Sequence, residues 1–222
     1  MGINMETAIN IQQPLNATLT PENISRIIDN ILKLPPSIKL RFGKVETKSD
    51  WQSVMAFRLK MYDQTVKYML NELNADGSDD YDAHSFIFAV WHEDSVIATI
   101  RLTPAPFETT QFLSPAQLTS FLGNTPEKTY LEWTRLLIDS SLKIHTLLPA
   151  ITVYAGLIIL TTTPYTQYFG YTKPIIRKIL SRFQLAEEKM TFSIPNRGDH
   201  AYQLLKGNFL NDFHHLVQTG LA

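Results

Sequence analysis

The chain has 222 residues, 44% of them hydrophobic and 18% charged, which is typical of a soluble globular protein that can bury a sizeable core. Its formal net charge of -1 gives no bulk attraction to nucleic acid, and we therefore expect no nucleic-acid partner. The absence of cysteine excludes disulfides, thiolate metal sites and a cysteine nucleophile, and it fits a reducing compartment.

Two features of the sequence bear on the location of the protein. Residues 1–13 lack the basic start and the apolar core of a secretory signal. The longest apolar run, Val153 to Leu160, is far shorter than the roughly 20 residues that a membrane span needs. We therefore expect a cytoplasmic protein without a membrane span.

The N-terminal region is expected to be a polar arm followed by one helix. Residues 1–19 are polar and without period, whereas Thr20 and Pro21 suit the cap and first turn of a helix with an apolar stripe, made of Ile24, Ile27, Ile28, Ile31 and Leu32. The stripe either packs on the rest of the chain or meets a partner, and packing is favoured because a short amphipathic helix needs a supporting surface. We divide the chain into residues 1–36, the arm and helix, and residues 37–222, the main domain.

A strand and a long helix come next. The alternation from Ile38 to Phe42 predicts a first strand, and helical periodicity predicts a helix from Trp51 to about Leu73. Arg58 falls within the apolar stripe of this helix, one turn before Tyr62. An arginine in such a place either extends its head group past the rim of the core or has a function.

Three strands are expected in the middle of the chain. A hairpin at 86–91 and 96–102 places Arg101 at the end of an apolar ladder, and a short helix follows from Ser114. The alternation of the third strand directs Glu132 and Thr134 to one face and Arg135 to the other. These strands bring charges next to buried sequence.

Asp79 and Asp82 add two acids in a turn-forming stretch before the hairpin. Charged groups are rarely buried unless they are paired, so this set predicts a charged network that lines a cleft. Structural ion pairs at the sheet edges are an equally good interpretation of the pattern alone.

The last part of the chain begins with a buried helix at 147–160 and a strand at 167–171. The helix that follows, opened by Lys173 and Pro174, is expected to carry one apolar face, made of Ile175, Ile176, Ile179, Leu180 and Phe183. Its other faces carry the cations Lys173, Arg177, Lys178 and Arg182, which form either a solvated face or a dock for an acidic partner. A strand at 190–194 and a helix around Ala201 to Leu205 complete the predicted elements.

Several common sites are absent from the sequence. The adjacent His214 and His215 point apart on a helix or strand and have no third ligand at a suitable spacing, so we expect no metal site. The nucleophile-elbow pattern Gly-x-Ser-x-Gly, the Walker loop and the Gly-rich pyrophosphate loop of coenzyme-A-dependent acetyltransferases are also absent. We expect no permanently bound cofactor.

Three short motifs nevertheless carry a resemblance to a known family. The chain reads Asp-x-x-Asp at 79–82, then Arg-Leu-x-Pro at 101–104 and Glu-x-x-Arg at 132–135. With this order and spacing, residues 58–183 resemble the acyl-homoserine-lactone synthases and the N-acyl amino acid synthases. The resemblance implies an α+β fold of three α/β/α layers with a mixed, mostly antiparallel sheet, like that of the GCN5-related acyl-CoA N-acyltransferases. The sheet should part between the strands of Glu132 and Gln167.

The resemblance also implies roles for individual residues. Glu132 matches the catalytic base, and six residues match acceptor-binding positions: Arg58, Tyr62, Asp79, Asp82, Arg101 and Arg135. The donor would be an acyl-phosphopantetheine thioester on acyl carrier protein or coenzyme A, and the cations from Lys173 to Arg182 would dock the carrier protein. Four apolar residues are candidates for the acyl slot on pattern only: Leu136, Ile138, Ile151 and Phe169.

The acceptor amine can be of two kinds. Gly77 stands where the lactone synthases have a glutamate, and Tyr68 to Asp76 contains no tryptophan, although both residue types help those enzymes to recognise S-adenosylmethionine. These departures favour an amino acid acceptor and an N-acyl amino acid product. An autoinducer synthase that uses S-adenosylmethionine is the alternative, and a non-catalytic binding module on the same fold is a second one.

Overall fold

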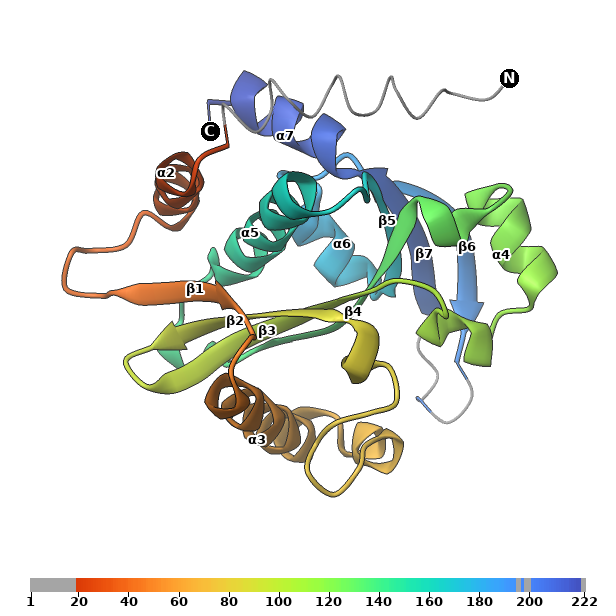
Figure 1. Ribbon diagram of the computed structural model, residues 1–222, viewed down its shortest axis with the longest axis horizontal. Helices are drawn as coiled ribbons and strands as arrows, with labels where there is room; N and C mark the ends of the chain where they lie inside the picture. The colour runs from red at the N-terminus through yellow and green to blue at the C-terminus, as the bar shows by residue number, and fades with distance from the viewer. Residues whose placement is uncertain (1–18, 195–196, 198–200, 221–222) are drawn as a thin grey trace.

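The computed structural model describes residues 19–194, 197 and 201–220, which form one seven-stranded sheet. The strands lie in the order β1-β2-β3-β4-β5-β7-β6, and every neighbouring pair is antiparallel except β4 and β5, which are parallel (Figure 1). The strands are β1 (Leu40–Lys44), β2 (Phe86–His92), β3 (Ser95–Thr103), β4 (Tyr130–Ile138), β5 (Gln167–Thr172), β6 (Glu187–Ser193) and β7 (Ala201–Asn208).

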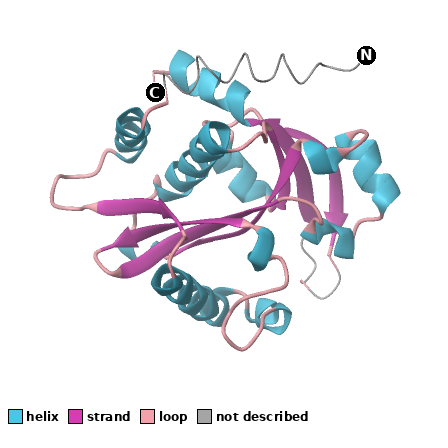
Figure 2. Cartoon of the chain, viewed as in Figure 1, coloured by secondary structure: helices cyan, strands magenta, loops and turns pink. Residues whose placement is uncertain are grey.

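Helices cover both faces of this sheet (Figure 2). Helix α3 packs on one face of β3 and β4, whereas α5 packs on the other face of β2 and β3 and is flanked by α2, α6 and α7. The bounds are α2 (Pro21–Leu32), α3 (Lys48–Thr65), α4 (Pro115–Leu122), α5 (Leu147–Thr162), α6 (Pro174–Leu180) and α7 (Phe209–Gln218). The predicted α+β class with three layers and a mixed, mostly antiparallel sheet is confirmed.

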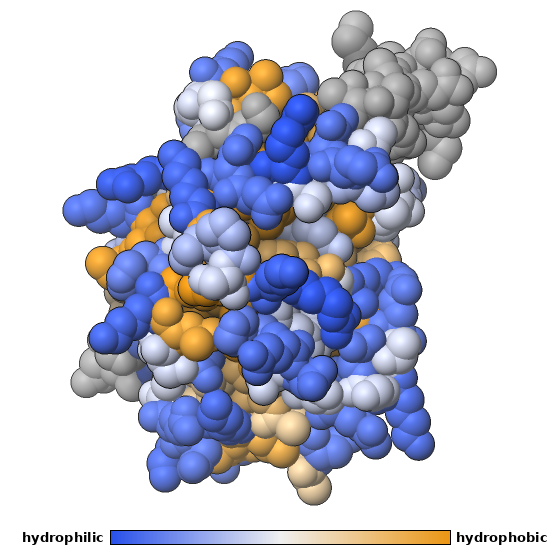
Figure 3. Space-filling view, turned by 90° about the vertical axis from the view of Figure 1, so that its left-hand side faces the viewer, coloured by the Kyte–Doolittle hydropathy of each residue, from blue (hydrophilic) through white to orange (hydrophobic). Residues whose placement is uncertain are grey.

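The N-terminal helix packs on the main body of the chain. The isoleucine stripe of α2 is buried against α5, and Thr146 at the start of α5 donates a hydrogen bond to the Leu32 carbonyl at 3.1 Å. A cavity of about 710 Å³ remains between α2, β1 and α5, on the side of the molecule where Figure 3 shows apolar side chains among hydrophilic ones. The predicted polar arm, apart from Leu19, lies outside the described residues.

Strand β4 contains a bulge that changes the direction of one predicted site residue. Arg101 pairs with Thr134 and Thr99 pairs with Leu137, so two residues of β4 oppose Ile100 alone. Arg135 in this bulge has a left-handed φ of 51°. The extra residue shifts the alternation, so the prediction that Arg135 faces away from Glu132 and Thr134 is wrong. Its side chain joins the same charged network as Arg101.

Strands β4 and β5 part after Trp133, just before the bulge, as the family resemblance implied. They pair only from Tyr130 to Trp133 on β4 and from Gln167 to Gly170 on β5. Beyond Gly170, β5 continues to pair with β7 on its other side. The sheet therefore opens in its middle, and α3 and α6 border the opening.

Two predicted elements differ in the structure. The segment from Ala201 to Leu205 is not a helix but the start of β7, because it pairs with strands on both sides, and this pairing overrides local preference. The helix predicted to reach Leu73 ends at Thr65, where the β-branched Thr65 and Val66 disfavour a further turn. A 3-10 helix (Lys67–Glu72) continues the chain.

Candidate functional site

A cavity of about 430 Å³ occupies the opening between β4 and β5. Its walls come from β4 beyond Trp133, from β5 at Gly170 to Thr172, from the end of α3 and from α6. The lining includes the apolar side chains Ile100, Leu136, Ile138 and Leu148, and a charged group, here called the charged end, made of Glu108 with Arg135 and Arg197 within 4 Å of it. The site therefore combines an apolar slot with a charged end.

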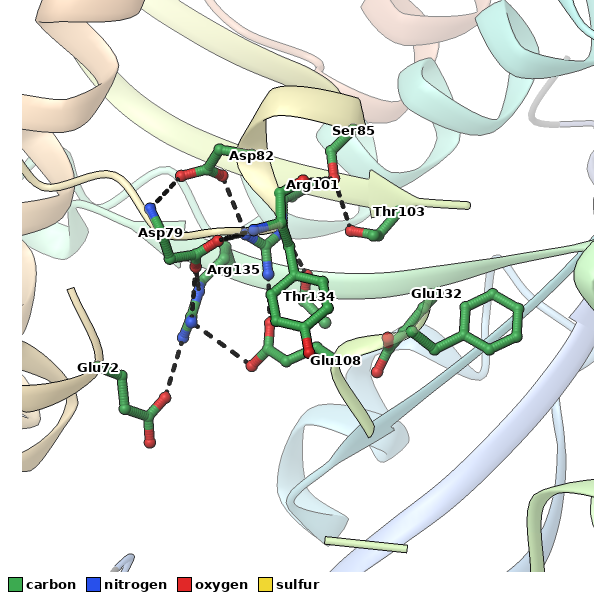
Figure 4. A network of polar contacts seen from close by, with 12 residues as sticks. Glu72, Asp79, Asp82, Ser85, Arg101, Thr103, Glu108, Glu132, Thr134 and Arg135 are labelled. Atoms are coloured by element: carbon green, nitrogen blue, oxygen red, sulfur yellow. Dashed lines mark hydrogen bonds and ion pairs between the residues drawn. The ribbon is translucent and has the colours of Figure 1, made fainter. Parts of the chain in front are cut away.

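Arg101 lies at the centre of the charged network (Figure 4). Its Nη1 donates to the carboxylates of Asp79 and Asp82, the latter at 2.9 Å, and its Nη2 donates to Glu108. Its Nε donates to the Thr134 hydroxyl at 2.9 Å. Because the side chain is fully buried and each nitrogen is engaged, Arg101 orders the carboxylates and does not face the cavity.

Arg58 ties the aspartate loop to α3. It forms a forked pair with Asp82, with nitrogen–oxygen distances of 2.6 and 3.0 Å, and it donates to the Gly77 carbonyl at 3.2 Å. Both charged side chains are almost completely buried. Asp82 in turn accepts the backbone N–H of Asp79 at 2.8 Å, so this pair sets the position of Asp79.

Gly77 has a structural reason to be glycine in this loop. Its φ is +91°, and a Cβ there would lie 2.5 Å from the Met55 carbonyl oxygen on α3. A glutamate at this position would require the loop to move away from α3. The close packing of the loop on α3 thus explains why this chain has glycine, and not glutamate, at position 77.

Arg135 extends the network to the cavity wall. Its Nε and Nη2 both bind Asp79, at 2.9 and 2.7 Å, and its Nη1 lies 3.4 Å from Glu72. Burial alone raises the pKa of the Asp79 carboxyl, but Arg101 and Arg135 outweigh burial and lower it overall. Asp79 is therefore ionised, and its negative charge holds Arg135 in place.

Three charged residues at or beside the cavity were not predicted from the sequence: Glu72, Glu108 and Arg197. Arg197 binds Glu72 with two bonds of 3.0 and 2.7 Å and donates to the Tyr171 hydroxyl at 2.6 Å. Glu108 lies in a 3-10 helix (Glu108–Gln111). Glu108 and Arg197 lie outside the segments with a predicted period, and Glu72 falls off the apolar stripe at the end of the helix that was predicted to reach Leu73.

Glu132 lies beside the network and behind the cavity wall (Figure 4). Its Oε1 accepts the backbone N–H of Thr109 at 3.0 Å and the Thr109 hydroxyl, whereas Oε2 has no hydrogen-bond partner among the described residues. Burial, followed by the like charge of Glu108, raises the pKa of Glu132 to about 8. The carboxyl is therefore mostly protonated at neutral pH.

Protonation of Glu132 balances the charge of the cluster. The ion pairs join four guanidinium groups (Arg58, Arg101, Arg135 and Arg197) to four carboxylates (Glu72, Asp79, Asp82 and Glu108). A fifth, ionised carboxylate would leave an unpaired buried negative charge. A neutral Glu132 avoids it.

The predicted acyl-slot residues divide into two groups. Leu136 and Ile138 line the cavity. Ile151 is fully buried in the core formed with α5, and Phe169 is fully buried in the core formed with α4, so neither reaches the cavity wall. For these two the pattern identified core residues.

Helix α6 lies at the cavity and exposes both cations and apolar side chains. Lys173, Ile176 and Leu180 line the cavity, whereas Lys178 and Arg182 are exposed and Arg177 is half-buried. Two residues of its predicted apolar face, Ile175 and Ile179, are 63% and 40% exposed. The short helix turns only part of its apolar surface to the sheet.

Comparisons of this structure with solved structures identify the fold. It is similar to the acyl-homoserine-lactone synthase LasI, with a TM-score of 0.59 and 12% identity over 78% of this chain and 90% of that one. FeeM, an N-acyl amino acid synthase from uncultured soil microbes, gives a TM-score of 0.60 and 10% identity over 82% and 98% of the two chains. The fold is that of the acyl-homoserine-lactone synthases. No family model matches the sequence, and no curated protein matches it either.

A third structure with this synthase fold is BjaI, a coenzyme-A-dependent acyl-homoserine-lactone synthase with bound S-adenosylmethionine and isopentyl-CoA. It has a TM-score of 0.58 and 12% identity over 77% of this chain and 82% of that one. The fold implied by the sequence motifs is thereby confirmed. At these identities the likeness concerns the fold, and the chemistry must be argued from this chain's own side chains.

Within the synthase fold, most of the predicted site residues converge. Arg58, Asp79, Asp82, Arg101 and Arg135 form one continuous network. Tyr62 is buried in the cavity wall at the end of α3. Among the described residues, no three metal-binding side chains cluster, and no helix is long and apolar enough to cross a membrane.

Proposed function

We propose that the protein is an N-acyltransferase that moves a fatty acyl group from a carrier thioester to the α-amine of an amino acid. The observation that carries this proposal is the cavity between β4 and β5, which is lined both by apolar side chains and by the charged end. A thioester arm can enter where the strands part, and its acyl chain can lie against Leu136 and Ile138. The charged end then receives the acceptor.

The reaction needs a neutral amine. The amine nitrogen attacks the thioester carbonyl, a carbon–nitrogen bond forms, and the carbon–sulfur bond breaks to release the carrier thiol. Glu132 is the base that we assign: with a pKa of about 8 its carboxyl is mostly protonated at pH 7, and its ionised form, which grows as the pH rises toward 8, accepts the proton. Since Glu132 does not line the cavity, the proton reaches it through an intervening group such as water.

The backbone at the sheet opening suits the developing oxyanion. Beyond Trp133, β4 no longer pairs with β5, so the backbone groups that β4 directs toward β5 lack that strand as a partner. N–H groups held rigidly at such a break can stabilise the negative oxygen of the tetrahedral intermediate. The bulge at Arg135 fixes the direction of these groups.

The choice of acceptor follows from the aspartate loop. Gly77 leaves no room for the glutamate of the lactone synthases without a shift of the loop, and this supports an amino acid. The shared network of Arg58, Asp82 and Arg101 supports the alternative, S-adenosylmethionine with an acyl-homoserine lactone as product. The two acceptors give products of different mass.

Mass spectrometry of products tests the proposal. The protein is incubated with acyl carrier protein thioesters or acyl-CoA of several chain lengths, the twenty amino acids and S-adenosylmethionine. We expect an N-acyl amino acid. Release of methylthioadenosine with a lactone would establish the other acceptor, and folded protein without any product would support a non-catalytic module.

Acyl carrier protein is the donor that we propose. Lys178 and Arg182 are exposed beside the apolar Ile175 and Ile179, and α6 borders the cavity at Lys173. An acidic carrier would be steered by these cations and held by the apolar side chains. Coenzyme A thioesters need no such surface.

Charge reversal on α6 separates the two donors. Lys178→Glu with Arg182→Glu should raise KM for acyl carrier protein thioesters by about tenfold and leave KM for acyl-CoA unchanged. Steady-state kinetics at low salt measures both values. Lys39→Glu, an exposed cation before β1, is the matched control. Equal KM values for the carrier protein in the variant and the control would contradict docking on α6.

A further inference from the structure

One carboxylate lines the cavity among the described residues, and it is Glu108. The other acids of the cluster lie behind the wall or beside it, including Glu132. Glu108 belongs to none of the three sequence motifs, and the acyl transfer proposed for this cavity assigns it no role.

The two oxygens of Glu108 have different surroundings. Oε2 accepts a hydrogen bond from Arg101. Oε1 is buried and accepts no hydrogen bond from the described residues, although Nη2 of Arg135 and Nη2 of Arg197 lie 3.5 and 3.7 Å away. A buried carboxylate oxygen without a hydrogen bond is costly, so such an atom at a cavity wall is suited to a donor supplied by a ligand.

We infer that Glu108 binds the amino group of the acceptor while Arg135 and Arg197 face its carboxylate. This inference rests on the proposed acyl transfer to an amino acid. An α-amino acid carries an ammonium and a carboxylate on the same carbon, and the cavity presents the matching arrangement, one carboxylate oxygen within 4 Å of two guanidinium groups. Asp79 and Glu72 hold these two arginines from the other side.

The same arrangement prepares the amine for attack. Three guanidinium groups, of Arg101, Arg135 and Arg197, surround Glu108 and disfavour the ammonium form of a bound amine. The next residue along the chain, Thr109, donates to Glu132 and so keeps the base close to Glu108. The ammonium gives one proton to the ionised form of Glu132, the nitrogen bonds to the acyl carbon, and the thiolate leaves with the carbon–sulfur electrons and takes up, through solvent, the second proton that the nitrogen loses.

Two variants and two acceptors separate the contacts. The acceptors are the amino acid that gives the most product in the panel above and its carboxamide, which keeps the amine and loses the carboxylate charge. Glu108→Gln should raise KM for both by about 10- to 100-fold, with KM for the acyl donor unchanged. Arg197→Gln should raise KM for the amino acid and leave that for the carboxamide nearly unchanged.

Controls keep the result independent of folding. Glu127→Gln changes an exposed carboxylate on the loop before β4 and should behave as wild type. If Glu108→Gln does not fold, Glu108→Asp keeps the charge at a shorter reach and should raise KM for both acceptors by a smaller factor. Unchanged acceptor KM in the folded Glu108 variant overturns the inference and leaves acyl transfer standing. Absence of transfer by the wild-type protein overturns both.

Discussion

Replacing Glu132 with Gln is expected to remove most of the turnover, by about 10²- to 10⁴-fold, while the protein remains folded. Glutamine has nearly the same shape, and its carbonyl can accept the Thr109 N–H as Oε1 does now. The wild-type carboxyl is mostly neutral at pH 7, so the substitution removes a proton acceptor and little charge. Single-turnover kinetics with a saturating acceptor measures the loss.

The pH profile attributes the effect to this carboxyl. With a pKa of about 8, Glu132 gains its basic form as the pH rises, so the wild-type rate should increase about tenfold per pH unit below 8 and level off above it. The ammonium of the acceptor titrates in both proteins. The step that disappears in Glu132→Gln therefore belongs to Glu132, and full activity with an unchanged profile would contradict the assignment.

Stability gives an independent check of the same pKa. Because the pKa of Glu132 is raised on folding, the folded protein binds the proton more tightly than the unfolded chain. The stabilisation is present at low pH and is lost as the pH rises toward 8. Glu132→Gln should therefore unfold at a urea concentration no lower than that of wild type at pH 9, which identifies lost turnover as chemical.

The sequence predicted Arg58 and Arg101 in the charged network because both lie on regular, mostly apolar segments. A charge in such a buried place had to be paired, and the turn-forming stretch supplied its partners, Asp79 and Asp82. Arg135 was assigned to the wrong face because one extra residue in β4 reverses the alternation, and no local signal marks that residue.

Glu108 and Arg197 show where sequence patterns have no information. Arg197 and Glu72 are 125 positions apart, and Glu108 lies in a 3-10 helix that follows a proline-containing turn. Irregular segments have no period from which the direction of a side chain can be inferred. Only the folded chain brings the three segments together, with Arg197 2.7 Å from Glu72 and 3.7 Å from Glu108.

Gly77 shows what the structure adds to a difference seen in the sequence. The sequence shows only that Gly77 replaces the glutamate of the lactone synthases, whereas the structure shows that this glycine has a left-handed φ and packs against the Met55 carbonyl. The loop therefore approaches α3 closely enough for Arg58 to reach both the Gly77 carbonyl and Asp82. The same packing that disfavours a glutamate also fixes the aspartates that hold Arg101 and Arg135.

Replacing Asp82 with Ala should lower the free energy of unfolding by about 3–5 kcal/mol, because it leaves the fully buried Arg58 without a counter-charge. Urea unfolding measures the change. Asp63→Ala breaks an exposed ion pair between α3 and Lys67, just beyond the end of that helix, and should cost less than about 1 kcal/mol.

A double variant identifies the origin of the loss. Arg58→Met combined with Asp82→Ala leaves no unpaired guanidinium at this place, so it should be more stable than Asp82→Ala alone. Equal stability of the single and double variants would mean that Asp82 acts mainly through its bonds to Asp79 and Arg101.

Because Asp82 sets the position of Asp79, and Asp79 holds Arg135 at the cavity wall, both variants should also raise the acceptor KM.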